Sequence, residues 1–549
     1  MAAKQAGFWH RHRVLKWALS VLLLVLTTAG VAISIALHKA EPMLRAAIVK
    51  QLEEHFHARV ELDSFHVSLV NGLWAEGEGL RIWPPQSASA PNQWPLIRLQ
   101  EFRFHATLHY KPGEPVKVSV VQLRRLDIDI PPKSHLGHAV QAEHGEQRGT
   151  PLVHFVVGSI VCNDAHLTIE TDKPGKLPLE FAIAHVELTH ANAGGSMQFD
   201  AEVTNPRPEG KILTSGRAGP WAVDDPGETP LKGSYRFEHA DLGVFKGIAG
   251  ILQSTGKYVG VLRDLTMDGE TDTPDFRLTQ FGTALPLHTV FHAHVDGTNG
   301  DTYLQPVHAT LGQSRFTCEG KVVRLSPGTD KNGTAAPGGH EIDLNVLVNG
   351  GRMEDFLRLT SKSATPLLTG TLALKTTLKI PPGTAPVDER LRLKGSFILE
   401  DAQFTSTKIQ NEVRELSLRG QGRPKEAKHA AGADVRSAMR SDFTMADAVI
   451  TLPNLQYAVQ GAEIDLKGIY NINGELLNFV GTARTDATIS QMVGGWKGEL
   501  LKPADRFFKK DGAGTEISIH VRGTREDPKF GVDLIPKQHT TPEIPGQPR

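Results

Sequence analysis

Apolar and polar residues alternate with a period of two over most of this chain. The alternation is clear at Phe102 and Phe104, Leu126 and Ile128, Met197 and Phe199, Leu372 and Leu374, Ile464 and Leu466, and Ile517 and Ile519. Successive strand side chains point to opposite faces, so this pattern predicts strands with one dry face and one wet face. Short Gly, Pro or Asn turns between them favour antiparallel meanders, and we expect a mainly β fold.

One segment near the N-terminus has a different pattern. The 21 residues from Trp17 to Leu37 carry no charge, and as a helix of roughly 31 Å they would cross a bilayer. A cleavable signal peptide is the alternative, but the apolar run is long for one and no small-x-small site follows it. We expect an uncleaved anchor whose residues include Trp17, Leu22, Leu23, Leu24, Ile33 and Leu37.

The basic residues around this segment predict its orientation. Lys4, Arg11, Arg13 and Lys16 precede it, whereas Lys39 and Arg45 follow it with Glu41 between them. The positive-inside bias therefore predicts a cytoplasmic N-terminus, with the bulk of the chain on the other side of the membrane.

Apolar residues recur at helical spacing in four shorter places. The first begins at Glu41 and places Leu44, Ile48, Leu52 and Phe56 on one face. The others are expected over 241–258, with Leu242, Phe245, Ile248 and Leu252 on one face, over 353–360, and over 489–510 with interruptions at Gly494, Gly495 and Pro503. Polar stretches at 131–150, 325–341 and 421–438 are expected to be loops.

These segments predict an order of regions along the 549 residues. We expect a cytoplasmic basic tail at 1–16, a transmembrane helix at 17–38, an N-terminal β-rich region at 39–240, a central helix-plus-β region at 241–350, a C-terminal β region at 351–535 and a disordered tail at 536–549. A weak internal likeness relates Leu311–Gly320 (LGQSRFTCEG) to Val459–Gly468 (VQGAEIDLKG) without a gap. Repeated β units would produce it, and so would any two strands that end in a turn glycine.

Composition narrows the function. Lys and Arg number 60 against 61 Asp and Glu, so no basic surplus is present to neutralise phosphates and we expect no nucleic-acid partner. The two cysteines, Cys162 and Cys318, are not a disulfide framework. A single bridge between them and a buried role for each both stay open, and the buried role is favoured.

No catalytic or metal-binding motif is present. The chain contains no G-x-S-x-G, Walker or H-E-x-x-H sequence. The pairs His55/His57 and His292/His294 have strand spacing, but no Cys or carboxylate completes a metal site, and solvated strand histidines explain them better. Asp127 and Asp129 could mimic a carboxylate pair, although wet-face acids are the simpler explanation. We expect no enzyme, no metal and no cofactor.

The apolar side of a two-faced sheet must be buried against something. Stacked sandwiches and a sheet curled into an apolar trough need the same alternation, and the pattern alone favours sandwiches.

Several segments resemble the AsmA/TamB superfamily of bacterial envelope proteins. The likeness begins with the basic tail, the anchor and LRAAIVKQLEEHFHARVELDSFHVSLVNGLWAEGEGLRI (44–82), and continues from Phe245 to Phe276. It is clearest from Arg352 onward, where RMEDFLRL, TPLLTGTLALKTTLKIPPG, LRLKGSFILEDAQFT, LSLRGQG, GAEIDLKGIYNI, ISQMVGGWKG and GTREDPKFGVDL follow one another. The order of these segments is more specific than any one of them, and residues 84–235 are the least similar part.

The resemblance implies an elongated, curled antiparallel sheet that forms an open trough with an apolar interior. It implies a protein of the inner membrane and periplasm that conducts or binds phospholipid or other acyl lipids for outer-membrane biogenesis. The candidate trough wall is Phe102, Phe104, Leu372, Leu374, Ile464, Leu466, Ile517 and Ile519. The alternative is a non-enzymatic scaffold of β-sandwich units that docks envelope assembly partners.

Overall fold

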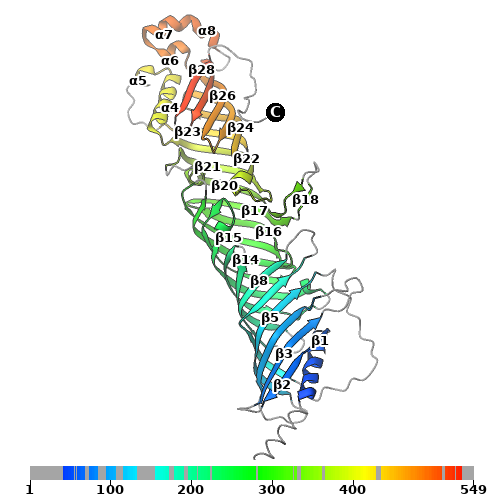
Figure 1. Ribbon diagram of the computed structural model, residues 1–549. Helices are drawn as coiled ribbons and strands as arrows, with labels where there is room; N and C mark the ends of the chain where they lie inside the picture. The colour runs from blue at the N-terminus through cyan, green and yellow to red at the C-terminus, as the bar shows by residue number, and fades with distance from the viewer. Residues whose placement is uncertain are drawn as a thin grey trace, which may run out of the picture. The chain divides into compact units, whose positions relative to one another are not determined.

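The computed structural model describes most of the chain beyond residue 40 (Figure 1). The described residues are 41–54, 56, 58–68, 73–83, 94–106, 115–132, 155–171, 178–190, 196–206, 208–222, 225–279, 282–325, 327–329, 335–360, 365–427, 435–509, 514–525 and 527–533. They form two compact units, of which the first takes in residues up to 171, 178–204 and 214–232, and the second takes in 205–213 and 233 onward. Strands dominate both units, so the prediction of a mainly β fold is confirmed.

The first unit is a mixed sheet. Its strands are β1 (Arg59–Glu61), β2 (Ser64–Ser68), β3 (Leu73–Trp83), β4 (Ile97–Ala106), β5 (Val116–Ile130), β6 (Phe155–Cys162), β7 (Ala165–Ile169), β8 (Leu179–Thr189) and β9 (Met197–Pro206). β10 (Glu209–Ala218) and β11 (Pro230–Asp241), with the short turn η2 (Pro226–Glu228) between them, lie where the division between the units falls. Strands β1 and β2 both pair with β3, and β3, β4 and β5 follow as an antiparallel series.

The prediction of a wholly antiparallel sheet is wrong at one place. Strand β5 runs parallel to both β6 and β7, which in turn pair antiparallel with β8. Parallel neighbours need a crossover connection of a dozen or more residues. The polar stretch expected at 131–150 lies between Ile130 and Phe155, so it provides the length that the parallel pairing of β5 with β6 requires.

A helix covers the apolar side of the first unit. Residues 41–54 are helical, as predicted. Their apolar residues Leu44, Ile48 and Leu52, together with Phe56, pack against a buried cluster that contains Phe65, Phe102 and Phe104. The rings of Phe102 and Phe104 are stacked with centroids 6.3 Å apart. The helix therefore covers the part of the apolar side that contains this cluster.

The second unit contains a long antiparallel meander. Its strands are β12 (Ile248–Ala249), β13 (Ile251–Val261), β14 (Asp264–Leu278), β15 (Leu285–Asp296), β16 (Asp301–Leu311), β17 (Ser314–Leu325), β20 (Gly339–Arg352), β21 (Leu368–Ile380), β22 (Arg392–Phe404), β23 (Ser437–Ala446), β24 (Val449–Val459), β25 (Ala462–Asn471), β26 (Leu476–Thr485), β27 (Thr515–Thr524) and β28 (Pro528–Asp533). From β13 each strand pairs with the next, except that β17 pairs with β20 across the small hairpin of β18 (Gly328–Thr329) and β19 (Ala335–Ala336). Figure 1 shows these strands side by side in the order of the chain.

Two of the expected helices in this unit are confirmed. α2 spans Met353–Leu359, and the segment near 489–510 forms α6 (Ile489–Val493), α7 (Gly495–Leu501), η4 (Lys502–Ala504) and α8 (Asp505–Phe508). The breaks come at the predicted Gly494 and Pro503. Three helices were not predicted: α3 (Val387–Arg390), α4 (Thr407–Gly420) and α5 (Pro424–Ala427), the last within the stretch expected to be a loop.

The helix predicted over 241–258 is wrong. This segment holds the turn η3 (Leu242–Val244) and the short strand β12 (Ile248–Ala249), and strand β13 begins at Ile251. Gly247 and Gly250 have φ of 100° and 142°. A right-handed helix needs negative φ, so the chain cannot be helical across these two residues. From Gln253 to Val261 the strand pairs residue by residue with β14, so backbone hydrogen bonds to a neighbouring strand replace the helical ones.

The predicted anchor, 17–37, lies outside the described residues, as do the tail at 536–549, His55 and His57. Among the residues that the structure describes, no helix has the length and apolar character needed to span a bilayer.

Candidate functional site

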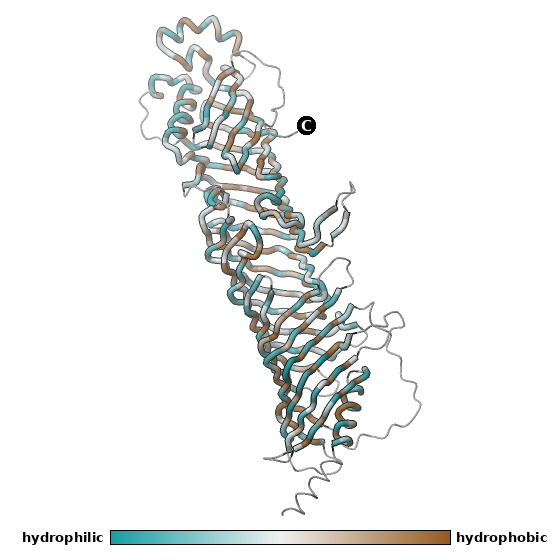
Figure 2. Tube along the Cα trace, in the orientation of Figure 1, coloured by the Kyte–Doolittle hydropathy of each residue, from teal (hydrophilic) through white to brown (hydrophobic). Residues whose placement is uncertain are grey.

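The cross-strand register of the second unit collects apolar side chains on one side of its sheet, which we call the apolar face. One file of paired residues crosses seven strands: Leu344, Leu378, Leu393, Met445, Ile450, Tyr470 and Leu477. Residues between them in sequence, such as Lys394 and Thr444, are exposed on the other side. Figure 2 shows hydrophobic and hydrophilic residues alternating along these strands.

Burial on the apolar face is incomplete. Leu374 and Phe397 pair across β21 and β22, yet both side chains are only half-buried. Phe102 and Phe104 in the first unit are 6% and 7% exposed. A sheet packed face to face on a second sheet would bury its inner residues to a similar degree. Much of the apolar face therefore lacks a covering layer among the described residues.

The predicted wall residues fall into three groups. Phe102 and Phe104 lie in the closed core of the first unit. Leu372 is 3% exposed and belongs to a cluster that α2 covers, and Leu374 packs at the margin of that cluster. The remaining four, Ile464, Leu466, Ile517 and Ile519, are half-buried on the apolar face.

Strand β26 joins these last four residues. Ile464 and Ile517 both pair with Ala483, and Leu466 and Ile519 both pair with Gly481. The small residues between them leave two shallow apolar files across β25, β26 and β27. The structure thus brings together four of the eight predicted wall residues, and it places the two phenylalanines in a different unit.

The two segments of the predicted internal repeat have the same local structure. Leu311 pairs with Ser314, and Val459 pairs with Ala462, so each segment is a hairpin with a two-residue turn. All four of these residues are less than 9% exposed. Each hairpin is bonded to a short helix at its turn, α2 in one case and α4 in the other.

Asp355 on α2 holds the first hairpin. Its carboxylate is 2% exposed and accepts hydrogen bonds from the backbone N–H of Gln313 (3.0 Å) and the hydroxyl of Ser314 (2.8 Å). Ser314 Oγ also accepts from the N–H of Arg352 at 2.8 Å. These contacts fix α2 over the edge of the apolar face, where its Phe356 and Leu357 pack against Leu372 and its neighbours.

Ser417 on α4 holds the second hairpin. Its hydroxyl donates to the carbonyl of Gln460 at 2.7 Å, and the side chain is 1% exposed. Gly461, in the turn, has a φ of 87° and lies so close to α4 that a Cβ would stand 2.9 Å from the Ser417 carbonyl oxygen. Both helices are therefore held at the side of the apolar face where these turns lie.

The part of the face over β13 to β15 is more polar. The Tyr235 ring lies over Gly256 and Gly269, where any side chain would collide with it. Its hydroxyl bonds to Ser254 Oγ at 3.0 Å, and burial raises the pKa of this phenol. The Thr271 and Thr289 hydroxyls pair at 2.7 Å on the same side.

The opposite side of β14 and β15 carries the histidines. His288, His292 and His294 bond through Nδ1 to Asp272 (2.7 Å), Asp268 (2.6 Å) and Asp264 (3.2 Å). Each histidine thus has its own carboxylate on the exposed side. Among the described residues no group of three or more His, Cys, Asp or Glu side chains is arranged to hold a metal ion.

Asp127 and Asp129 are ion-paired to one arginine. Arg98 Nη2 lies 3.2 Å from Asp129 and its Nε lies 4.0 Å from Asp127. The two carboxylates lie on β5 and share this one cation on β4, as ion-paired acids on the polar side of a sheet do.

The two cysteines are free. Cys162 is 1% exposed in the core of the first unit. Cys318 lies on the apolar face, paired with Val307 on one side and Val346 on the other, and burial raises the pKa of its thiol.

Sequence reasoning missed Asp355 and Ser417. The only signal for Asp355 was an acidic residue in the first turn of a predicted helix, and Ser417 belongs to a helix that was not predicted.

Comparison with known proteins adds no relative: no family model, no curated protein and no solved structure matches this chain.

Proposed function

We propose that the apolar face of the second unit binds acyl chains, as the interior of an open, curled sheet. On this proposal the chain handles phospholipid or other acyl lipids without catalysing a reaction. Residues 17–37 would tether it to the inner membrane with its bulk in the periplasm, where it would serve outer-membrane biogenesis. The location and the wider role rest on the resemblance to the AsmA/TamB superfamily, and the binding surface rests on the geometry below.

The partial exposure of the apolar face carries the proposal. Val346, Leu374, Phe397, Ile464 and Leu466 all point to one side, and each is half-buried. Each methylene that leaves water contributes about 0.8 kcal/mol. An acyl chain on this face would therefore remove apolar surface from water on both partners, which a sealed core cannot do.

The arrangement of the files favours movement along the sheet as well as binding. Files such as Leu466, Gly481 and Ile519 continue from strand to strand through small residues. A chain lying across them keeps a similar apolar contact area as it moves from one strand to the next, so no step requires full return to water. Transfer of this kind is passive.

The polar side of each strand suits water. Lys375 and Lys394 are exposed between apolar-face residues, and Lys379 pairs with Asp343 and Glu341. Lipid headgroups would remain hydrated at the open side while the tails are covered.

The test is binding of a fluorescent-acyl phospholipid to the purified full-length chain and two inward variants, Leu374→Asp and Leu466→Asp. A carboxylate on the apolar face would have to be desolvated by the lipid tail, so we expect each variant to lower lipid capture about tenfold. Thr377→Asp is the matched control, because Thr377 lies on the exposed side of the strand that carries Leu374.

Two results would count against acyl binding. Equal capture by all four folded proteins would show that the apolar face is not the binding surface. No capture by the wild type would favour the scaffold alternative, in which the second unit only docks other proteins.

A further inference from the structure

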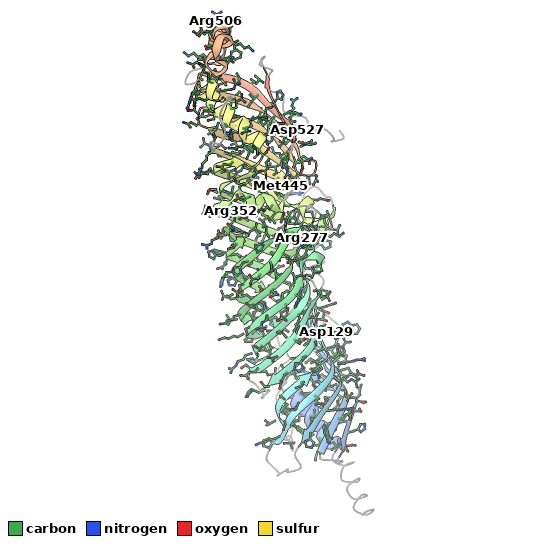
Figure 3. All side chains as sticks on the ribbon, turned by 90° about the vertical axis from the view of Figure 1, so that its left-hand side faces the viewer. Asp129, Arg277, Arg352, Met445, Arg506 and Asp527 are labelled. Atoms are coloured by element: carbon green, nitrogen blue, oxygen red, sulfur yellow. The ribbon has the colours of Figure 1, made fainter. Side chains whose placement is uncertain are left out.

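The helices α6, α7 and α8 form a separate surface beyond the last strands of the second unit (Figure 1). Figure 3 places Arg506 at the extremity of this unit. We call the helical segment 489–509 the helical tip. Its outward side carries large apolar side chains that are exposed.

In two pairs of neighbouring apolar residues of the tip, one side chain is exposed and the other is partly buried. Leu500 and Phe507 are 69% and 72% exposed, whereas their sequence neighbours Leu501 and Phe508 are partly buried. The second residue of each pair is thus the one turned inward. Val493 adds a third exposed apolar residue, at 37%.

The tip holds these residues in place with hydrogen bonds. Asp505 accepts from the Ser490 backbone N–H at 2.9 Å and from the Ser490 hydroxyl at 2.6 Å. Gly498 lies so close to the Ser490 carbonyl that a Cβ would stand 2.4 Å from it. Arg419 on α4 donates to the Met492 carbonyl at 3.1 Å. The exposed apolar residues are therefore presented on a braced structure.

Cations surround the apolar residues. Lys497, Lys502, Arg506 and Lys509 are all exposed in the tip. The acidic residues of the tip are Glu499 and Asp505. Glu499 pairs with Lys502 at 2.6 Å, and the Asp505 carboxylate accepts a hydrogen bond from Ser490. The guanidinium of Arg506 lies 4.8 Å from the centre of the Phe507 ring.

We infer that the helical tip docks on the surface of a bilayer that contains anionic phospholipid. Exposed Leu and Phe side chains flanked by Lys and Arg are the chemistry of interfacial helices, in which apolar groups enter the acyl boundary and cations stay among the headgroups. The net positive charge of the tip makes an anionic surface the matching partner. This inference goes beyond acyl binding by the apolar face and stands on different residues.

The test uses the full-length chain held on beads by an N-terminal affinity tag and incubated with fluorescent vesicles. The vesicles contain phosphatidylcholine alone, or phosphatidylcholine with phosphatidylglycerol at about 7:3, since anionic lipid attracts basic segments within a Debye length. The variants are L500S/F507S, which removes the apolar contact, and K502E/R506E, which reverses the charge. The control is I398S, because Ile398 is 50% exposed on the other side of β22.

We expect the wild type and I398S to capture the anionic vesicles equally and both double variants to capture at least about fivefold less. We also expect less capture of the neutral vesicles than of the anionic ones. Undiminished capture by L500S/F507S, or equal capture of neutral and anionic vesicles, would overturn the inference. All variants share residues 17–37, so membrane insertion there cannot produce the difference. The readout is vesicle capture, so its failure is distinguishable from failure of acyl binding.

Discussion

Phe397 on β22 pairs with Leu374 on β21, and both side chains remain half-buried on the apolar face. The centroid of the Phe397 ring lies 6.2 Å from the centroid of the Phe443 ring. Aromatic and aliphatic residues thus contact one another on this face without being sealed from water.

Because the apolar face is less buried than a closed core, truncating one of its side chains to alanine should lower the free energy of unfolding by a smaller amount. Phe102→Ala should cost about 3–5 kcal/mol of local stability, as in a fully buried site, whereas Phe397→Ala should cost about 1–2 kcal/mol. Native-state hydrogen exchange of β4 and β22 measures the two separately. Equal costs would mean that the apolar face is as well covered as the core of the first unit.

Removal of the Asp355 carboxylate should loosen the β16–β17 hairpin. Asp355→Ala leaves the Gln313 N–H without its acceptor beneath α2 and removes one partner of Ser314, which should cost about 2–3 kcal/mol. Hydrogen exchange of β16 and β17 reports the effect. Glu415→Ala, which breaks only an exposed pair with Arg419, should change stability by less than about 0.5 kcal/mol. A similar small effect for Asp355→Ala would show that it does not hold the hairpin.

The helical tip should loosen in acid. The Ser490 hydroxyl that donates to Asp505 is the main cause that holds the pKa of this carboxyl below its ordinary value of 3.8. A depressed carboxyl pKa means that the stabilisation is complete above 3.8 and is lost as pH falls through the lower, folded value. A nitroxide attached to a cysteine at position 500, with Cys162 and Cys318 replaced by alanine, should gain mobility on this descent.

The matched variant for the acid effect is Asp505→Asn. Its amide cannot be charged. At neutral pH we therefore expect higher nitroxide mobility than in the labelled chain that keeps Asp505, and this mobility should change little as the pH is lowered. If Asp505→Asn kept the same acid-induced change, another group would be responsible.

Acyl lipid should protect the thiol of Cys318. Burial raises the pKa of this thiol, so alkylation by a maleimide should be slow at neutral pH and should accelerate as pH rises and the thiolate forms. Added phospholipid should slow the reaction at Cys318. It should not slow the reaction at a cysteine placed at Thr317, which precedes Cys318 on the same strand and belongs to the alternate side. Equal protection at both positions would contradict lipid contact with the apolar face.

Local patterns in the sequence predicted much of the fold. The alternation around Leu374, Leu466 and Ile519 places these residues on the apolar side of their strands, because residues two apart in a strand point to the same face of the sheet. The apolar residues at every fourth position from Leu44 to Phe56 likewise predicted the first helix. These features depend on residues close together in the chain.

Features that depend on distant partners were not predictable in this way. The parallel pairing of β5 with β6 joins segments that are distant in the chain, and the alternation within either strand does not mark its direction. The segment from Leu242 to Leu252 has helical apolar spacing, but pairing with β14 and the positive φ of Gly250 decide for a strand.

Helix α4 had local signals that the alternation obscured. Ser406 caps its N-terminus through Ile409 N–H, and Ile409, Val413 and Leu416 repeat at helical spacing. The candidate wall was only partly placed, because alternation cannot distinguish the sealed Phe102 from the half-buried Leu466. Cover by a second element is a tertiary property.

Photocrosslinking at two neighbouring positions of β25 tests acyl binding most directly. A benzophenone amino acid replaces Leu466, on the apolar face, or Lys467, which is exposed on the other side, in the full-length chain in cells. Mass spectrometry then identifies the crosslinked species after irradiation. Acyl binding predicts phospholipid adducts at position 466 and few or none at position 467. Adducts at both positions alike, or only protein adducts at position 466, would contradict it.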